Sequence, residues 1–269
     1  MAERFVEAQG LRVRYLEEGE GKEVLLLHGA SLGSSCDVWA EMMPMLAARG
    51  LRVIALDQPG FGGSDISPDD SVGFRTTFVP AFLDALGVAR ACVVGHSQAG
   101  RIAVNLALKE SQRVDRIVIV GTASLLPPLR GTQKGDAEGD EEGGAEPTED
   151  EVRRLLEGQL FDAARATPER IALRHRMSTG RNFEAFLARR AAKARSKGEK
   201  GGAPWERLAQ VLLPMRLVYG RQDRAAEARA ALARERLPAL DLHLVDRCRH
   251  LVMWDAPETL ASLIGEFAA

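Results

Sequence analysis

The sequence has little of what marks several large classes of protein. Its 269 residues include only three cysteines, Cys36, Cys92 and Cys248, which are far apart, odd in number and in no metal-ligand spacing. This favours a reducing compartment and thiols that simply pack, rather than a disulfide framework. No apolar run reaches the ~20 residues of a membrane span, and the N-terminus MAERFVEAQG has no apolar signal-peptide core. We therefore expect a soluble protein of the cytoplasm with no membrane partner.

An excess of charge of either sign is also absent. The chain has 36 Lys and Arg against 38 Asp and Glu, a formal net charge of -2. This balance gives no electrostatic reason to expect nucleic acid as a partner. The sequence also has no dinucleotide-binding fingerprint and no metal-ligand cluster, so we expect no cofactor and no metal. A small molecule is the expected partner, and the oligomeric state is left open, with a homo-oligomer among the options.

What the sequence does have is an alternation of short apolar runs with longer amphipathic ones. Hydrophobic residues make up 45% of the chain, enough for a sizeable core. The runs predict strands at 5–8, 11–16, 24–27, 53–56, 91–94, 116–120, 215–219 and 240–245. Helical spacing predicts helices at 39–48, 74–86, 99–109, 225–235 and 257–267. Because most of the strands are fully apolar, we expect an α/β fold with a mostly parallel eight-stranded sheet and helices on both faces.

The alternation stops between residues 124 and 204. Residues 131–150 contain eight acidic side chains, one lysine and no large apolar side chain, which predicts a flexible loop. Residues 151–195 have a helical pattern and predict a small helical cap. We therefore expect a core formed by residues 1–123 and 205–269, with the cap and its acidic loop inserted between them.

The stretch Gly95-His96-Ser97-Gln98-Ala99 is the first that indicates chemistry. It places a serine between small residues at a predicted strand-to-helix junction, the pattern of a nucleophile elbow. Small neighbours avoid clashes in that strained turn, which exposes the serine Oγ at a helix N-terminus, where developing negative charge is favoured. The competing interpretation is an ordinary serine N-cap.

A serine hydroxyl needs a base, and the base needs an orienting acid. His250 follows the last predicted strand, and Asp223 follows the first strand after the cap. The chain order Ser97, Asp223, His250 is that of α/β-hydrolases. Three other acids compete for the orienting role: Asp241, Asp246 and Asp255.

An acyl reaction also builds an oxyanion, which needs two preorganised N–H donors. The backbone N–H of Gln98 is one candidate because it follows the serine. The second is the N–H of Ala30 or Ser31, in the glycine-containing loop after the third strand. The alternative for this loop is a plain glycine turn.

Taken together, these residues resemble an α/β-hydrolase over essentially the whole chain. DQPGFGGSD at 57–65 is similar to the family's tight turn after the fourth strand. Four stretches are more narrowly similar to the meta-cleavage-product hydrolases, which break a carbon–carbon bond in ring-fission products of aromatic catabolism: HGASLGSSCDVW, LFDAARATPERIALRHRMS, PWERLAQVLLPMRLVYGRQDR and LHLVDRCRH. The resemblance implies that a cap arginine holds the substrate's carboxylate, which by alignment is Arg174, with Arg176 as its nearest competitor.

The resemblance further implies hydrolysis of a vinylogous diketone acid. The expected substrate contacts are His96, Arg174, Gly29 and Leu251. Several positions depart from the family's usual residues: His96 stands in place of Asn, Gln98 in place of Met, and Arg249 and Leu251, on either side of the base, in place of Gly and Trp. The loop after the third strand also lacks the family's Gly-Pro step. A carboxylesterase or lactonase acting on a small ester is the main alternative, and a non-catalytic receptor or a cofactor-free dioxygenase of the same fold are further ones. Ser97 argues against haloalkane dehalogenases and epoxide hydrolases, which use Asp at the elbow.

Overall fold

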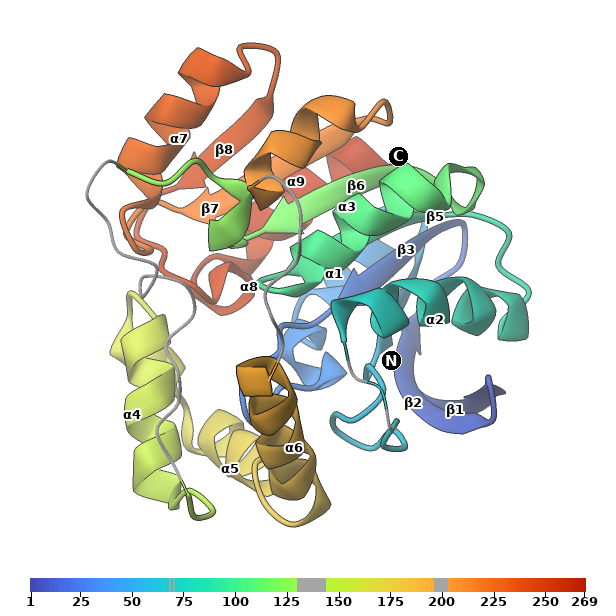
Figure 1. Ribbon diagram of the computed structural model, residues 1–269, viewed down its shortest axis with the longest axis vertical. Coiled ribbons are helices and arrows are strands. Elements are labelled where there is room, and N and C mark those ends of the chain that lie inside the picture. The colour runs from blue at the N-terminus through green and yellow to red at the C-terminus, as the bar shows by residue number, and fades with distance from the viewer. Residues whose placement is uncertain (68, 70, 130–143, 196–202) are drawn as a thin grey trace.

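The computed structural model describes residues 1–67, 69, 71–129, 144–195 and 203–269. Its centre is one eight-stranded sheet with the strand order β1-β2-β4-β3-β5-β6-β7-β8 (Figure 1). The strands are β1 (Ala2–Ala8), β2 (Leu11–Glu18), β3 (Lys22–Leu27), β4 (Leu51–Leu56), β5 (Ala91–His96), β6 (Val114–Val120), β7 (Met215–Gly220) and β8 (Asp241–Val245). β2 is antiparallel to both β1 and β4, and the other pairs are parallel. The expected α/β-hydrolase sheet is confirmed.

The period of two along each central strand builds two separate apolar layers. Leu25 and Leu27 of β3 lie in one layer, and Val24 and Leu26 lie in the other. The first layer is completed by α2 (Val72–Ala85), α3 (Ala99–Lys109) and α7 (Ala226–Arg236). The second is completed by α1 (Met43–Ala47), α8 (Val252–Asp255) and α9 (Pro257–Ala268). A sheet buried on both faces is the reason for the fully apolar strands.

One expected helix is wrong in its bounds. Residues 39–48 do not form one helix, because a 3₁₀ turn at Cys36–Trp39 is followed by a separate helix, α1. Pro44 lies in the first turn of α1. Proline suits that position because its missing N–H has no partner there, whereas inside a longer helix it would break the hydrogen-bond ladder. The sequence pattern predicts the apolar face of this segment but not its division into a 3₁₀ turn and a helix.

Among the described residues between β6 and β7, the α-helices are α4 (Glu149–Gln159), α5 (Pro168–Arg176) and α6 (Arg181–Arg195). Figure 1 shows them side by side at one end of the molecule, and we call them the cap helices. The acidic loop expected at 131–150 ends earlier, because Thr148 and Glu151 form a capping box that starts α4. Residues 131–143 of that loop lie outside the described residues, and the boundaries of core and cap stay a prediction.

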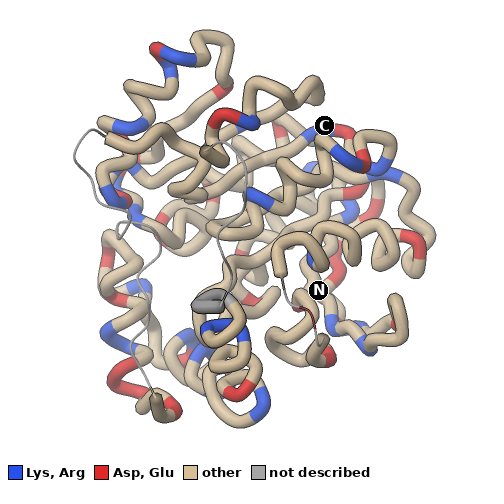
Figure 2. The backbone as a smooth tube through the Cα atoms, in the orientation of Figure 1, with Lys and Arg blue, Asp and Glu red and all other residues tan. Residues whose placement is uncertain are grey.

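Positions of both charges occur throughout the described chain. Figure 2 shows Lys and Arg positions interspersed with Asp and Glu positions along the coloured part of the backbone. The three cysteines are free and buried. In the described part of the chain, none of the helices combines the length and the apolar character that crossing a bilayer requires.

Candidate active site

Ser97 occupies the turn between β5 and α3 in a strained backbone conformation. Its φ is +53°, a left-handed value that is uncommon for a residue other than glycine. A side chain on Gly95 would place its β-carbon 2.4 Å from the carbonyl oxygen of Ala99, and one on Gly100 would lie 2.0 Å from Thr122 Oγ1. The small residues around the serine are therefore required by close packing, and the turn has the geometry of a nucleophile elbow.

The structure brings the three expected triad residues together. The hydroxyl of Ser97 donates to Nε2 of His250 over 3.2 Å, and Nδ1–H of His250 donates to Oδ2 of Asp223 over 2.9 Å. All three residues are buried, at 7 to 8% exposure. Apolar surroundings strengthen such polar contacts, because water competes less for them. This arrangement can pass a proton from the hydroxyl to the imidazole while the carboxylate holds the ring in place.

The competing acids have other partners. Asp241 pairs with Arg216 at 2.8 Å, and Asp246 pairs with Arg221 at the surface. Asp255 accepts hydrogen bonds from backbone N–H groups of the segment that follows α4. None of the three contacts the imidazole of the triad.

The backbone around His250 is held by groups that the sequence did not reveal. The carbonyl of Gln159, at the end of α4, accepts from the backbone N–H of His250 at 3.0 Å and of Leu251 at 3.3 Å. Nε2–H of His96 donates to the carbonyl of His250 over 3.1 Å. The cap helices and the elbow therefore both fix the position of the base. The side chain of Leu251 packs in the second apolar layer, so its expected contact with substrate stays a prediction.

The loop after β3, residues 28–36, lies against the elbow, and we call it the oxyanion loop. A β-carbon added to Gly29 would lie 3.1 Å from that of the elbow serine. Among the described residues, no acceptor is bonded to the backbone N–H of Ala30, Ser31 or Gln98. These N–H groups are the ones expected to hold an oxyanion.

The side chain of Gln98 has a partner that the sequence did not predict. Arg75 of α2, only 4% exposed, donates from Nη2 to Oε1 of Gln98. The two residues are 23 positions apart, and Arg75 lies in the first turn of a helix whose apolar pattern gave no sign of a buried guanidinium. It fixes the side chain of a residue whose N–H is a candidate oxyanion donor.

Two further buried histidines stand beside the triad. Burial lowers the pKa of His28 to about 4, and burial together with the neighbouring His250 lowers the pKa of His96 well below its usual range. His28 is fixed through both ring nitrogens, because Nδ1–H donates to the carbonyl of Gly29 (2.6 Å) and Nε2 accepts from the N–H of Gln58 (3.1 Å). Both imidazoles are therefore neutral at pH 7 and bring no charge to the site.

Arg174 reaches the oxyanion loop from α5. It is 6% exposed and donates from Nη2 to the hydroxyl of Ser31 over 2.6 Å. A β-carbon on Gly33 would lie 2.9 Å from Cδ of Arg174, so the stem of the arginine also packs against this loop. The competing Arg176 is exposed. The structure thus places a buried positive charge beside the candidate oxyanion donors.

A cavity of about 340 Å³ lies between the oxyanion loop and the cap helices. Its apolar lining includes Leu32, Val152, Phe183 and Phe186. None of its described lining residues belongs to the triad.

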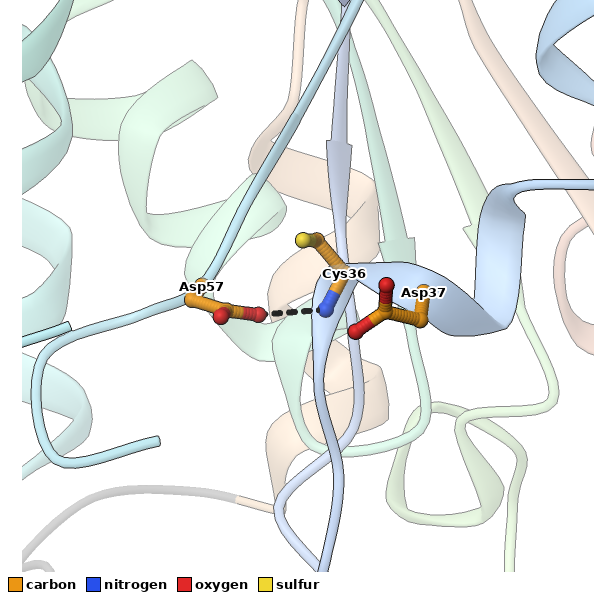
Figure 3. A group of neighbouring side chains, drawn as sticks. All are labelled: Cys36, Asp37 and Asp57. Carbon is orange, nitrogen blue, oxygen red and sulfur yellow. Dashed lines mark hydrogen bonds between the residues drawn. The ribbon is translucent and has the colours of Figure 1, made fainter. Parts of the chain in front are cut away.

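One group of side chains has the atoms and spacing of a metal site. The ligand atoms of Cys36, Asp37 and Asp57 lie within 4.8 Å of one another (Figure 3). The guanidinium of Arg14 already contacts all three, at 3.3 Å from the sulfur and at 2.8 and 3.0 Å from the two carboxylates. These contacts, led by the hydrogen bond with Asp37, raise the pKa of Arg14, so a fixed cation fills this group and we assign no metal to it.

Comparisons with known proteins place this site in a family. The alpha/beta hydrolase fold family matches residues 23–257. The chain belongs to the α/β-hydrolase family. This α/β-hydrolase is 30% identical to the 2-hydroxy-6-oxononadienedioate/2-hydroxy-6-oxononatrienedioate hydrolase of Burkholderia vietnamiensis, over 96% of this chain and 91% of the relative. It is 32% identical to the 2-hydroxymuconate semialdehyde hydrolase of Pseudomonas sp. strain CF600, over 99% of this chain and 93% of the relative.

Solved structures agree with these relatives. The α/β-hydrolase superposes with a TM-score of 0.81 on a serine hydrolase involved in carbazole degradation, at 25% identity and with 99% and 98% of the two chains covered. It superposes with a TM-score of 0.78 on the meta-cleavage product hydrolase of Pseudomonas fluorescens IP01, at 26% identity over 98% and 96%. The expected fold, the resemblance to meta-cleavage-product hydrolases and the class of enzyme, a hydrolase, are confirmed.

Proposed function

We propose that this α/β-hydrolase cleaves a carbon–carbon bond in a meta-cleavage product of aromatic degradation, with Ser97, His250 and Asp223 as its catalytic triad. The observation that carries the proposal is the hydrogen-bonded series from the elbow hydroxyl through the imidazole to the buried carboxylate. The names of the relatives support the class of substrate, a dienol that carries a carboxylate and a distant carbonyl group, which is a ketone in the first name and an aldehyde in the second.

The geometry suits a reaction in two stages. The enol proton of the substrate first moves to the carbon beside the distant ketone, and His250 is the group placed to carry it. Oγ of Ser97 then bonds to the ketone carbon while its proton passes to Nε2 of His250. The resulting oxyanion is held by the N–H of Gln98 and that of Ala30 or Ser31.

Breaking the carbon–carbon bond completes the transfer. The electron pair of that bond delocalises into the dienoate product, which takes the proton from His250. Water then hydrolyses the acyl group on Ser97 with the same imidazole as base and releases an acid. The two N–H donors suit both the formation and the hydrolysis of the acyl group, because each of these steps builds negative charge on the same oxygen.

Arg174 is the residue we propose for the substrate's carboxylate. Its guanidinium is buried against Ser31, so a carboxylate beside it is close to the oxyanion loop. An arginine in a low-dielectric site holds a carboxylate through strong charge-assisted hydrogen bonds. His96 and Gly29 flank the same region and are the further proposed contacts.

Two substrates in parallel assays test the proposed function. One is a coloured ring-fission dienol, followed by loss of its absorbance, and the other is a p-nitrophenyl ester. We expect the dienol to be consumed with a kcat/KM far above that for the ester. Fast ester cleavage with an untouched dienol would assign the protein to the carboxylesterases or lactonases instead. Saturable binding of the dienol without turnover would identify a receptor.

Replacing Arg174 with alanine tests the carboxylate contact. We expect kcat/KM for the acidic dienol to fall by about 10²-fold, since a charge-assisted contact in a buried site contributes roughly 2–3 kcal/mol. For the neutral ester, kcat/KM should fall by less than about threefold, because the ester has no carboxylate for the arginine to bind. Steady-state kinetics on both substrates give the comparison.

The matched control for this variant is Arg176→Ala, which removes an exposed arginine from the same helix. This variant should leave kcat/KM unchanged for both the dienol and the ester. Equal losses for the dienol and the ester in Arg174→Ala would remove Arg174 from carboxylate binding.

The setting of the reaction is also part of the proposal. We propose a cytoplasmic enzyme, because its three buried free thiols suit a reducing compartment. All three triad residues come from one chain, so a single protomer holds the proposed machinery. A homo-oligomer stays a prediction from the sequence.

A further inference from the structure

We propose that Asp57 is a positioning residue for the oxyanion hole. It would act by fixing the far end of the oxyanion loop, whose first half carries the N–H groups of Ala30 and Ser31. The inference rests on the proposed hydrolytic function, and it explains why a fully buried carboxylate lies beside the site with no part in the triad. Asp57 touches no reacting atom, so its role is exerted through the backbone that it holds.

The first observation is the set of backbone donors bound to Asp57. One carboxylate oxygen accepts the N–H of Cys36 over 2.6 Å, at the end of the oxyanion loop (Figure 3). The other accepts the N–H of Gly63 over 2.8 Å, within the turn that follows β4. A β-carbon on Gly62 would lie 2.0 Å from the same oxygen, so the turn is wrapped closely around the carboxylate. One side chain therefore joins the oxyanion loop to residues 57–65, which we call the β4 turn.

The residue next to Asp57 fixes the other end of the same loop. Nε2–H of Gln58 donates to the carbonyl of His28 over 2.6 Å, and its backbone N–H donates to Nε2 of the same imidazole over 3.1 Å. The amide oxygen of Gln58 is buried, and it has no hydrogen-bond partner among the described residues. Burying an unpaired amide oxygen is unfavourable. The hydrogen bond from Nε2–H to the carbonyl of His28 is therefore the contact through which this side chain stabilises the loop. Two consecutive residues thus hold both ends of the oxyanion loop.

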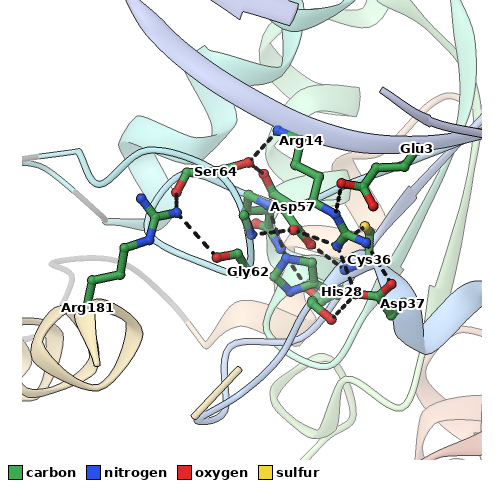
Figure 4. A network of polar contacts seen from close by, with 12 residues as sticks. Glu3, Arg14, His28, Cys36, Asp37, Asp57, Gly62, Ser64 and Arg181 are labelled. Carbon is green, nitrogen blue, oxygen red and sulfur yellow. Dashed lines mark hydrogen bonds and ion pairs between the residues drawn. The ribbon is translucent and has the colours of Figure 1, made fainter. Parts of the chain in front are cut away.

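The charge of Asp57 is balanced by a buried cation. Nη1 of Arg14, on β2, donates to Oδ2 of Asp57 over 3.0 Å and to Asp37 over 2.8 Å (Figure 4). A carboxylate with no exposed surface would be strongly destabilising without such a partner. Because Arg14 lies on a strand of the central sheet, these contacts tie the oxyanion loop to the sheet.

The cap reaches the same turn from the other side. Nη2 of Arg181, at the start of α6, donates to the carbonyl of Ser64 over 2.6 Å and contacts that of Gly62 (Figure 4). Arg189, two turns further along α6, donates to the carbonyl of Gly60 over 2.9 Å. The β4 turn therefore contacts both the cap and the oxyanion loop, and Asp57 is the side chain that joins this turn to the loop.

The Asp57→Asn variant tests this role. It keeps the shape of the side chain but replaces one of its two acceptor oxygens with a donor, so one of the two backbone N–H groups loses its partner. We expect kcat for the p-nitrophenyl ester to fall by about 10- to 100-fold, part of the loss seen when an oxyanion donor is removed outright. KM should stay within about threefold, because the ground-state contacts are unchanged.

Asp37→Asn is the matched control. Asp37 pairs with the same arginine and loses the same charge, but its carboxylate accepts from the side chains of Arg14 and Ser35, whereas that of Asp57 accepts the backbone N–H of Cys36. Its kcat should stay within about threefold of that of the wild type. A second readout is the inhibition constant of phenylboronic acid, which forms a tetrahedral adduct with the serine and so depends on the oxyanion donors. We expect it to rise at least about tenfold in Asp57→Asn and to stay unchanged in Asp37→Asn.

The outcomes separate this inference from the proposed function. A wild-type protein that hydrolyses neither substrate contradicts the proposed function. An active wild type, with a folded Asp57→Asn variant that matches Asp37→Asn in kcat and in boronate affinity, overturns the role of Asp57 alone. If Asp57→Asn does not fold, Gln58→Met removes the Nε2–H donor at the other end of the loop. That variant should lower kcat by at least about fivefold with KM unchanged, and wild-type kinetics would overturn the inference.

Discussion

Replacing Ser97 with alanine is expected to lower kcat for both the dienol and the ester by at least about 10⁴-fold. The change removes the oxygen that attacks the carbonyl carbon, while the N–H groups of Gln98, Ala30 and Ser31 stay in place. Substrate should still bind with a Kd close to that of the wild type, because the proposed carboxylate contact lies on a different element. Steady-state turnover and equilibrium titration of the dienol measure the two quantities separately.

The matched control for this variant is Ser111→Ala, which changes an exposed serine in the turn before β6. It should leave kcat within about twofold of that of the wild type, as surface substitutions normally do. A Ser97→Ala protein that folds and still cleaves the ester at more than about a hundredth of the wild-type rate would mean that another group is the nucleophile.

Replacing Asp223 with asparagine should lower kcat by about 10³- to 10⁴-fold with little change in folding. The carboxylate accepts Nδ1–H of His250 and so keeps Nε2 free to receive the proton of Ser97. An amide can present its N–H₂ group to the ring instead, which favours the opposite tautomer and leaves Nε2 protonated. The asparagine keeps the size of the side chain, so kcat should fall without a large change in the melting temperature.

The control for the acid is Asp246→Asn, because Asp246 follows the next strand but pairs with Arg221 at the surface. Its kcat should match that of the wild type. If Asp246→Asn caused the large loss and Asp223→Asn did not, the orienting acid would be assigned wrongly. Asp241→Asn is a further control, because Asp241 pairs with Arg216. We expect this variant to lower the melting temperature and to leave kcat unchanged.

The parts of this account that the sequence predicts well are those with a local cause. Gly95 and Gly100 are glycines because the elbow has no room for a β-carbon at either position, and that constraint can be read from the residues around the serine. The strands are apolar throughout because the sheet is covered on both faces, which gives the fold class. The order of serine, acid and base follows from which strands those residues terminate.

The parts that the sequence does not predict depend on contacts between distant segments. Arg14 lies in a strand whose letters alternate without any sign that its guanidinium is buried, and its partners come from two other loops. The carbonyl of Gln159 meets His250 only because the end of α4 lies beside the loop after β8. A main-chain group has no signature in the sequence, so such a contact becomes visible only in the folded structure.

The measurement that tests the central claim most directly is covalent labelling with a fluorophosphonate, followed by mass spectrometry of the digested protein. The reagent reacts with a serine hydroxyl only where a base activates it and N–H donors hold the phosphoryl oxygen. The account predicts one adduct, on the peptide that contains Ser97, formed at least about 10²-fold more slowly in the Asp223→Asn variant. An adduct on a different residue, or no adduct in an otherwise active protein, would contradict it.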